Sequence, residues 1–348
     1  MSSKLGQFAK KTLEEYVPII DKKLARYWDE EISLDFGFND KQKEIVKDML
    51  VHAKEHNLRA SKRLRGSFVR YGYLLGNNKT NEKLDNAEMA IELVHTALLM
   101  HDDFMDQDNL RRGKPTTHKY YKDRMGGNSH YGDTMAVNIG DAVLCLGFQL
   151  LQDSSAMNQL LRGITNTAWG QAYDVTLEAM KNWTEEDVIV LHKAKTAIYT
   201  YENPLFIGAQ MAKLPKEVFE ILHDYAMDGG VAFQLQDDIL GVFGDEEKTG
   251  KSADSDLRQG KCTLLVLKAF DRSEVKRVWG NRLATKEELD LAKKAIVNCG
   301  SYEYNMKLAQ EYAIRAAKTA ERLRSLSLNL EAIDYIQGIA EYMVTREV

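Results

Sequence analysis

Residues 87–106 read AEMAIELVHTALLMHDDFMD, an apolar stretch that ends in a group of aspartates. Apolar side chains recur on nearly every face of the helix that this pattern predicts, which is typical of a helix at the centre of a protein. Asp85, just upstream, is the expected N-cap. The stretch therefore predicts a central helix that carries a cluster of carboxylates at its C-terminal end.

The rest of the chain favours helices as well. Only 4 prolines occur among 348 residues, which leaves room for long uninterrupted helices. Apolar spacing predicts further helices over 8–30, 41–60, 141–161, 165–180, 185–211 and 216–242. The glycine-rich stretch 111–132 and the polar stretch 244–261 are expected to be irregular. No segment of useful length has a β-strand period, so we expect one all-α domain over 1–348, with the helices of 1–60 packing on its body.

Composition and charge argue against several classes of protein. The 47 basic and 52 acidic residues give a formal net charge of −5, which does not suit a general nucleic-acid binder. No run of about 18 apolar residues occurs, so no transmembrane segment is expected. The N-terminus lacks the apolar core of a secretory signal. Cys145, Cys262 and Cys299 show no metal-ligand spacing and suit a reducing compartment, so we expect a cytoplasmic protein.

Two acidic clusters at the ends of apolar helices point to a metal site. Asp102, Asp103 and Asp106 are spaced to share one helix face, where like charges repel unless a cation lies between them. The helix dipole makes anions at a C-terminal end still less favourable. Asp237 and Asp238 lie near the end of a second apolar stretch, GGVAFQLQDDILGVF. Carboxylates suit magnesium, which keeps other positions for phosphate oxygens; two solvated helix ends are the alternative.

Basic residues bracket both acidic clusters. Arginine forks and lysine ammonium groups bind phosphate oxygens, although each one alone is more often a surface charge. The basic residues that stand out are Lys62, Arg65, Arg111, Arg112, Lys195, Lys251 and Lys261. Carboxylates that bind magnesium, together with several cations, are typical of a site for a diphosphate.

Several motifs, in order along the chain, resemble those of the trans-type polyprenyl diphosphate synthases, which include farnesyl and geranylgeranyl diphosphate synthases. They are KRLR, ELVHTALLMHDDFMD followed by QDNLRRG, GQAYD, KTAIYTYENPLFIGA, FQLQDDILGVFGDEEKTGKS and DLRQGKCTLL. The resemblance spans roughly residues 60–265. It implies an isoprenoid-synthase-type helical bundle with a central apolar cavity, in which isopentenyl diphosphate is joined to an allylic diphosphate.

The resemblance also implies roles for residues around the allylic diphosphate. Magnesium, as three ions, would be held by Asp102, Asp103, Asp106, Asp237 and Asp238. The diphosphate itself would be gripped by Arg111, Lys195, Lys251 and Lys261. Thr196 and Gln234 would lie beside the reacting allylic carbon.

A second set of residues is implied for isopentenyl diphosphate. Its pocket would be formed by Lys62, Arg65, His95 and Arg112, with His95 as a binding group and not a general base. Gln171 and Asp174 match a helix near the site. The expected allylic partners are dimethylallyl, geranyl and farnesyl diphosphates, and the resemblance implies a homodimer.

The sequence departs from the family pattern at two positions. Gly241 stands where many farnesyl-forming members have a third aspartate of the second cluster, a change familiar among longer-chain members. Ser61 stands where a glycine usually precedes KRLR, which leaves Lys62 and Arg65 in register.

Product length is expected to depend on the helix before Asp102. Ala97 and Leu98 lie five and four residues upstream, where farnesyl-forming relatives often carry a bulky aromatic side chain. Because Ala97 is small, the product pocket is expected to continue past Val94. We expect C20 geranylgeranyl diphosphate as the product, with C25 or longer chains and C15 farnesyl diphosphate as alternatives.

Three other functions remain open from sequence alone. A class I terpene cyclase shares aspartate-rich metal chemistry but needs no isopentenyl pocket, so KRLR and His95 argue against it. A regulatory subunit of a heteromeric synthase would tend to lose the catalytic aspartates, which this chain keeps. A purely structural helical protein would bind no diphosphate.

Overall fold

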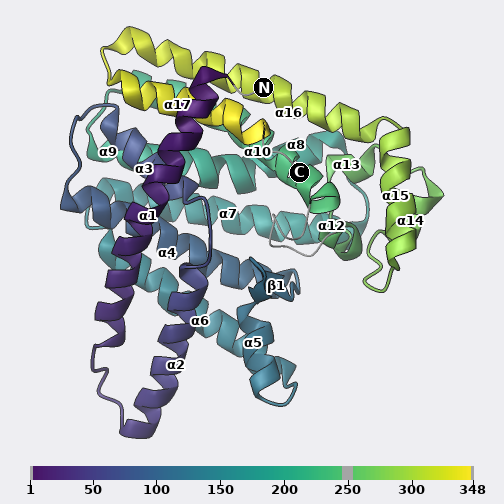
Figure 1. The fold of residues 1–348 in the computed structure, drawn as a ribbon, viewed down its shortest axis with the longest axis horizontal. Coiled ribbons are helices and arrows are strands. Elements are labelled where there is room, and N and C mark those ends of the chain that lie inside the picture. The colour runs from purple at the N-terminus through teal and green to yellow at the C-terminus, as the bar shows by residue number, and fades with distance from the viewer. Residues whose placement is uncertain (1–2, 245–253, 346–348) are drawn as a thin grey trace.

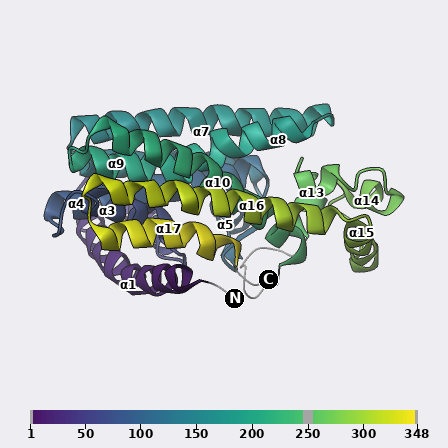
Figure 2. The same cartoon turned by 90° about the horizontal axis from the view of Figure 1, so that it is seen from above.

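The computed structural model describes residues 3–244 and 254–345, and nearly all of its regular structure is helical (Figures 1 and 2). Its elements are α1 (Lys4–Ile32), α2 (Asp40–Asn57), α3 (Leu64–Leu74), α4 (Glu82–Met105), β1 (Leu110–Arg111), β2 (Lys114–Pro115), α5 (Thr117–Arg124), α6 (Ser129–Leu150), α7 (Ser154–Met180), α8 (Glu185–Leu191), η1 (His192–Glu202), α9 (Asn203–Met211), α10 (Lys216–Phe243), α12 (Ser255–Gln259), α13 (Leu264–Leu267), α14 (Ser273–Val278), α15 (Lys286–Asn298), α16 (Ser301–Glu321), η2 (Arg322–Leu326) and α17 (Leu330–Val344). Within the two described ranges, every helix is too short or too polar to span a lipid bilayer. The predicted all-α class is confirmed.

Helix α4 is buried along most of its length, as its apolar pattern predicts. Leu93, Ala97 and Met100 belong to a core cluster that includes side chains of α1, α10 and α17. Ile91 and Val94 lie in a second cluster with side chains of α7 and α9. The C-terminal end of α4, which carries the first aspartates, is therefore fixed by packing on two sides.

The N-terminal helices α1 and α2 pack on this core. Helix α1 packs along α17 and forms a hairpin with α2 (Figure 1). Leu13, Ile20 and Trp28 of α1 are almost fully buried, and the Trp28 indole donates a hydrogen bond to Asn57 Oδ1 at 3.0 Å. This bond fixes the end of α2, from which the chain enters the KRLR motif.

Several helix boundaries differ from the sequence-based predictions. Helix α4 begins at Glu82 because Asn81, not Asp85, accepts the capping hydrogen bond from Leu84 N. The stretch 111–132 is only partly irregular, because it holds part of a short β-hairpin, helix α5 and the start of α6. The predicted break between 161 and 165 lies instead near Asp153, whose side chain caps α7.

The stretch 185–211 is not one α-helix. It is divided into α8, the π-helix η1 and α9, a change of winding that apolar spacing alone does not reveal. Helix α9 packs closely on α3, since a Cβ on Gly208 would lie only 2.1 Å from the Val69 carbonyl oxygen. This close approach of two backbones fixes α3 against α9.

Candidate active site

Both acidic clusters open onto one cavity of about 1970 Å³. Asp102 and Asp106 reach it from the end of α4, and Asp237 and Asp238 reach it from α10. Helices α7 and η1 and the turn before α3 complete the wall with cationic and polar side chains. The fold thus brings together two groups of carboxylates that are far apart in the sequence.

The three aspartates of the first cluster do not share one environment. Asp103 is fully buried, and its Oδ1 accepts a hydrogen bond from Arg111 Nε at 2.7 Å, while His56 Nε2 lies 3.8 Å from its Oδ2. Burial raises the pKa of Asp103, but Arg111 and His56 outweigh it and bring the pKa below its ordinary value. Asp103 therefore anchors Arg111, whereas Asp102 and Asp106 line the cavity.

Arg111 is presented by the hairpin of β1 and β2. The hairpin turns through Arg112 and Gly113, both with positive φ, and Arg59 ties it down by donating to the carbonyl oxygens of Arg111 and Pro115 at 3.1 and 3.0 Å. Arg112 in turn donates to the Arg59 carbonyl oxygen at 3.2 Å. Burial, followed by the charges of other arginines, lowers the pKa of Arg112 to about 10, so it remains a cation at neutral pH.

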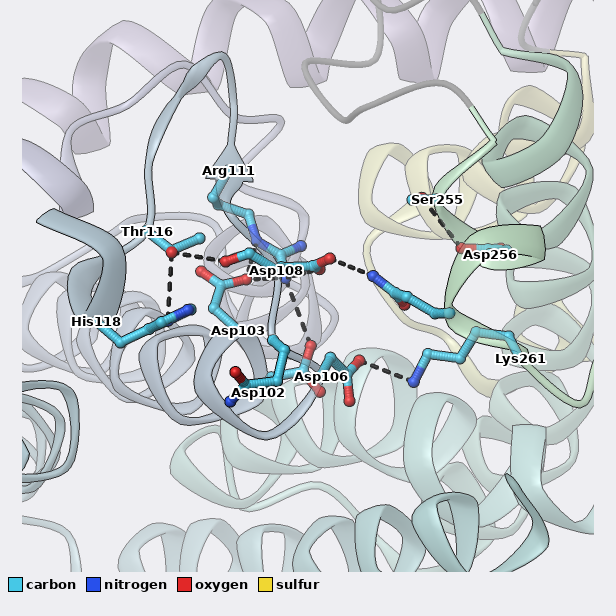
Figure 3. Close-up of polar contacts among 12 residues, drawn as sticks. Asp102, Asp103, Asp106, Asp108, Arg111, Thr116, His118, Ser255, Asp256 and Lys261 are labelled. Carbon is cyan, nitrogen blue, oxygen red and sulfur yellow. Dashed lines mark hydrogen bonds and ion pairs between the residues drawn. The ribbon is translucent and has the colours of Figure 1, made fainter. Parts of the chain in front are cut away.

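Two partly buried lysines balance the carboxylates on the cavity wall. Lys195 Nζ lies 3.5 Å from Asp102 Oδ1 and 2.9 Å from Asp174 Oδ2. Lys261 Nζ lies 2.8 Å from Asp106 Oδ2 (Figure 3). Burial opposes the charge on Lys195, but Asp102 and Asp174 outweigh it and raise its pKa. Gln171 also donates to Asp106 Oδ1 at 3.1 Å. These residues form one network of alternating charges.

The electrostatic environment of Asp106 is less favourable for its charge. Burial and then the neighbouring Asp102 raise the pKa of Asp106, although Lys261 and Lys195 act in the opposite direction. A divalent cation beside Asp102 and Asp106 would relieve this repulsion. The first cluster thus has the chemistry of a cation site.

Asp238 of the second cluster contacts polar side chains of α10 and η1. Gln234 donates to Asp238 Oδ1 at 2.8 Å and accepts a hydrogen bond from Thr196 Oγ1 at 2.7 Å. His192 Nε2 lies 3.2 Å from Asp238 Oδ2. His192 was not selected from the sequence, although its position three residues before Lys195 places it near the same helix face.

Gly241 lies beside a carboxylate that comes from another element. A Cβ added to Gly241 would be 2.1 Å from Asp256 Oδ2, and both residues line the cavity. Figure 3 shows Asp256 on α12, across the site from the aspartates of α4. Asp256 therefore fills the place beside the second cluster where a longer side chain at 241 would lie. Asp256 was not predicted as a site residue, although it is the first residue of the motif DLRQGKCTLL.

A third group of residues forms the end of the cavity near α3. Arg65 Nη1 lies 2.9 Å from His95 Nε2, and Arg65 Nη2 donates to Thr200 Oγ1 at 2.6 Å. Burial and then the charge of Arg65 lower the pKa of His95 well below its ordinary value, so the imidazole is neutral. Because an arginine only donates, His95 Nε2 accepts and the proton resides on Nδ1. Lys62 lines the same cavity.

The other predicted residues take different positions. Leu98 lines the cavity, whereas Ala97 and Val94 are fully buried in the core and do not belong to its lining. Lys251 lies outside the described residues. Within 3–244 and 254–345, no three or more His, Cys, Asp or Glu side chains are gathered closely enough to hold a metal ion by themselves. A metal held here would need further ligands, such as water or phosphate oxygens.

Known proteins resemble this chain over most of its length. Residues 47–299 match the Polyprenyl synthetase family. Geranylgeranyl diphosphate synthase of Methanosarcina mazei is 33% identical over 269 residues, covering 75% of this chain and 78% of the relative. Geranylfarnesyl diphosphate synthase of Aeropyrum pernix is 32% identical over 318 residues, covering 87% of this chain and 96% of the relative.

A solved structure agrees with the sequence relatives. The crystal structure of geranylgeranyl pyrophosphate synthase from Corynebacterium glutamicum, complexed with isoprenyl diphosphate and magnesium, has a TM-score of 0.84 and 25% sequence identity to this chain. The match covers 99% of this chain and 100% of that one. The resemblance inferred from the motifs is confirmed, and the chain belongs to the polyprenyl synthetase family of trans-prenyltransferases.

Proposed function

We propose that this enzyme joins isopentenyl diphosphate to dimethylallyl, geranyl and farnesyl diphosphates and releases C20 geranylgeranyl diphosphate. One observation carries the proposal: Asp102, Asp106 and Asp237 share a cavity with two groups of cations, one that includes Lys195 and one that includes Arg65. The cavity thus offers two cationic subsites, since Lys195 lies 3.5 Å from Asp102, whereas Arg65 contacts His95 and Thr200. Two diphosphates of different chemical roles fit this division.

Magnesium fits the carboxylate end of the cavity. It is usually held by one or two carboxylates, water and substrate phosphates, which suits small groups of aspartates better than a closed protein cage. We propose that Asp102, Asp106, Asp237 and Asp238 hold up to three magnesium ions. Asp103 was also predicted to bind magnesium. It is better placed to anchor Arg111, because its carboxylate accepts a hydrogen bond from that side chain. When bound, magnesium would neutralise charge developing on the leaving diphosphate.

The residues of the chain would act mainly by binding and orientation. Lys195 and Lys261 would exchange their carboxylate partners for oxygens of the allylic diphosphate, Arg111 would bind it while it stays paired with Asp103, and Lys251 is proposed to join them. The allylic C–O bond breaks with its electron pair going to the diphosphate, as these cations stabilise the developing charge. Thr196 and Gln234, linked at 2.7 Å, would flank the allylic carbon.

The second substrate would be bound by the group of cations that includes Arg65. Lys62, Arg65 and Arg112 would bind the diphosphate of isopentenyl diphosphate, and neutral His95 would donate from Nδ1. The double bond of this substrate attacks the allylic cation, and a proton then leaves to the released diphosphate. Water must be excluded during this step because it would quench the cation.

Product length is proposed to depend on the wall of the cavity near α4. Leu98 lines the cavity one helical turn before Asp102, and no aromatic side chain stands at 97 or 98. C20 is favoured because several relatives are geranylgeranyl diphosphate synthases. C25 is the second candidate, because the Aeropyrum pernix relative is a geranylfarnesyl diphosphate synthase.

A second copy of the chain is proposed to pack on α7. Trp169 is 72% exposed, and Leu161 and Val175 on the same helix are also exposed. Ala168 and Ala172 lie on this exposed stretch and also line the cavity. A partner covering α7 would therefore bury apolar surface and close the cavity wall.

The product assay tests the proposed function directly. Incubation with labelled isopentenyl diphosphate and each allylic primer is expected to give C20 as the main product, measured by chromatography. Leu98→Phe should shift the main product toward C15, because Leu98 lines the cavity and added bulk there obstructs the growing tail. Leu291→Phe, at a 54% exposed position on α15, is the control that should leave the product unchanged. A C15 product from the unaltered enzyme would contradict the proposed length, and C25 would favour the second candidate.

Magnesium dependence can be tested by removal and by substitution. Chelation should abolish turnover and added magnesium should restore it, because the carboxylates and the leaving diphosphate otherwise repel. Asp237→Asn should lower kcat by about 100-fold or more, and calorimetry should show weaker magnesium-dependent binding of pyrophosphate. Asp271→Asn, with a side chain 72% exposed, should behave like the unaltered enzyme. Full activity after exhaustive chelation would refute the metal assignment.

The contact between Gly241 and Asp256 gives a further expectation. Gly241→Asp should not improve the site but should lower kcat by about 10-fold or more, since the new side chain displaces the Asp256 carboxylate. Exchanging both positions, with Gly241→Asp and Asp256→Gly together, should recover part of the loss. Steady-state kinetics measure both effects. An active Gly241→Asp enzyme with normal constants would show that the two side chains do not compete for space.

Association of two copies can be measured by light scattering after size exclusion. The unaltered protein should have the mass of a dimer, and Trp169→Glu should shift it toward the monomer because a charge would be buried in an apolar contact. The exposed control Leu283→Glu should remain dimeric. A monomeric unaltered protein at micromolar concentration would argue against this surface as an interface.

A further inference from the structure

Arg63 is the one charged residue of the KRLR motif to which the proposed reaction gives no role. Its guanidinium is only 1% exposed. It donates to Asp21 Oδ1 of α1 at 2.7 Å, to the Asn57 carbonyl oxygen at the end of α2 at 2.6 Å, and to Glu92 Oε2 of α4 at 3.1 Å. One side chain therefore joins three helices at the point where α3 begins.

Glu92 of α4 binds the same turn, residues 63–66. Its Oε1 accepts the backbone N–H of Gly66 at 2.9 Å, while its Oε2 binds Arg63. A single buried carboxylate thus contacts residues before and after Arg65. The backbone of Arg63 is left-handed, with φ 51° and ψ 35°, a conformation that is unfavourable outside glycine and needs support from its surroundings. The Arg63–Glu92 pair and the Gly66 bond supply that support.

The Arg63–Glu92 pair lies next to the cationic subsite that contains Lys62, Arg65 and His95. Lys62 immediately precedes Arg63, and Arg65 follows two residues later; both line the cavity. His95 lies one helical turn after Glu92 on α4, and it contacts Arg65 at 2.9 Å. Glu92 is therefore attached to both elements that supply ligands to this subsite. A change in its contacts would move Lys62 and Arg65 relative to His95.

We propose that Arg63 and Glu92 are positioning residues that hold Lys62, Arg65 and His95 in register for the diphosphate of isopentenyl diphosphate. This inference rests on the proposed function of the cavity. Both residues border the cavity, but their side chains are almost fully buried and paired with each other, so they are proposed to act through the turn before α3 and not by contact with the substrate. Because a misplacement of about 1 Å can cost about 100-fold in rate, such a clamp has a measurable effect.

The same two helices contain a matched control. Arg70 of α3 binds Glu88 of α4, with Nε to Oε1 at 2.8 Å and Nη2 to Oε2 at 3.1 Å. Glu88 is fully buried, like Glu92, but neither Arg70 nor Glu88 lines the cavity. The two pairs therefore share the same chemistry and a buried carboxylate, and they differ in that only Arg63 and Glu92 line the cavity. Damage to either should destabilise the protein, but only one should disturb the subsite.

The experiment compares Glu92→Gln with Glu88→Gln in the full-length enzyme. Glutamine keeps the shape of the side chain and an oxygen for the Gly66 N–H, but it loses the charge that pairs with arginine. For Glu92→Gln, KM for isopentenyl diphosphate should rise by about 10-fold or more, while KM for farnesyl diphosphate changes by less than about 2-fold. Arg63→Lys should have the same selective effect, because an ammonium group cannot reach all three partners. Glu88→Gln should change neither KM, whatever its effect on the melting temperature.

Three outcomes decide the question. A selective rise in KM for isopentenyl diphosphate, with calorimetry showing weaker binding of that ligand to folded Glu92→Gln, supports the positioning role. An equal rise in both KM values, or an effect of Glu88→Gln equal to that of Glu92→Gln, overturns it in favour of a general structural role. If Glu92→Gln fails to fold, Arg63→Lys supplies the same comparison. Absence of prenyl transfer by the unaltered enzyme would instead refute the proposed function.

Discussion

The site depends on holding several carboxylates together in a partly buried cavity. Two opposite charges about 4 Å apart attract by roughly 4 kcal/mol near a protein surface, and like charges repel by a similar amount. Lys195 and Lys261 offset that repulsion at Asp102 and Asp106, and Arg111 does so at Asp103. The same cations are those that a diphosphate would attract, so the charges that stabilise the folded protein are also the ones that prepare it for its substrate.

The helical architecture serves this arrangement of charge. Helices α4 and α10 are buried on several sides, which fixes the ends that carry the aspartates. Backbone-to-backbone packing of α3 on α9 at Gly208, and the pairing of Arg63 with Glu92, fix the start of α3 against α4. Both groups of cations are thereby held in the wall of one cavity by helix packing.

The fold class, and many of the residues that line one cavity, could be predicted because they follow from local patterns. Apolar spacing predicted the central helix, and the aspartates and basic motifs predicted which residues would meet. The sequence did not show which of several possible partners each side chain would contact. Nothing in the order DDFMD tells that Asp103 turns to Arg111 while Asp102 faces the cavity. His192 and Asp256 were missed because their contacts with Asp238 and Gly241 arise only from tertiary packing. Helix ends shifted because asparagine and aspartate caps, such as Asn81 and Asp153, decide them locally.

The central claim is that aspartates from α4 and α10 gather divalent cations around one diphosphate. Crystals grown with manganese and an unreactive thio analogue of an allylic diphosphate would test it by anomalous diffraction. We expect anomalous peaks within ligand distance of Asp102 or Asp106 and of Asp237, each bridged to diphosphate oxygens. An analogue bound in the cavity with no manganese at these carboxylates, or manganese bound only elsewhere, would contradict the account.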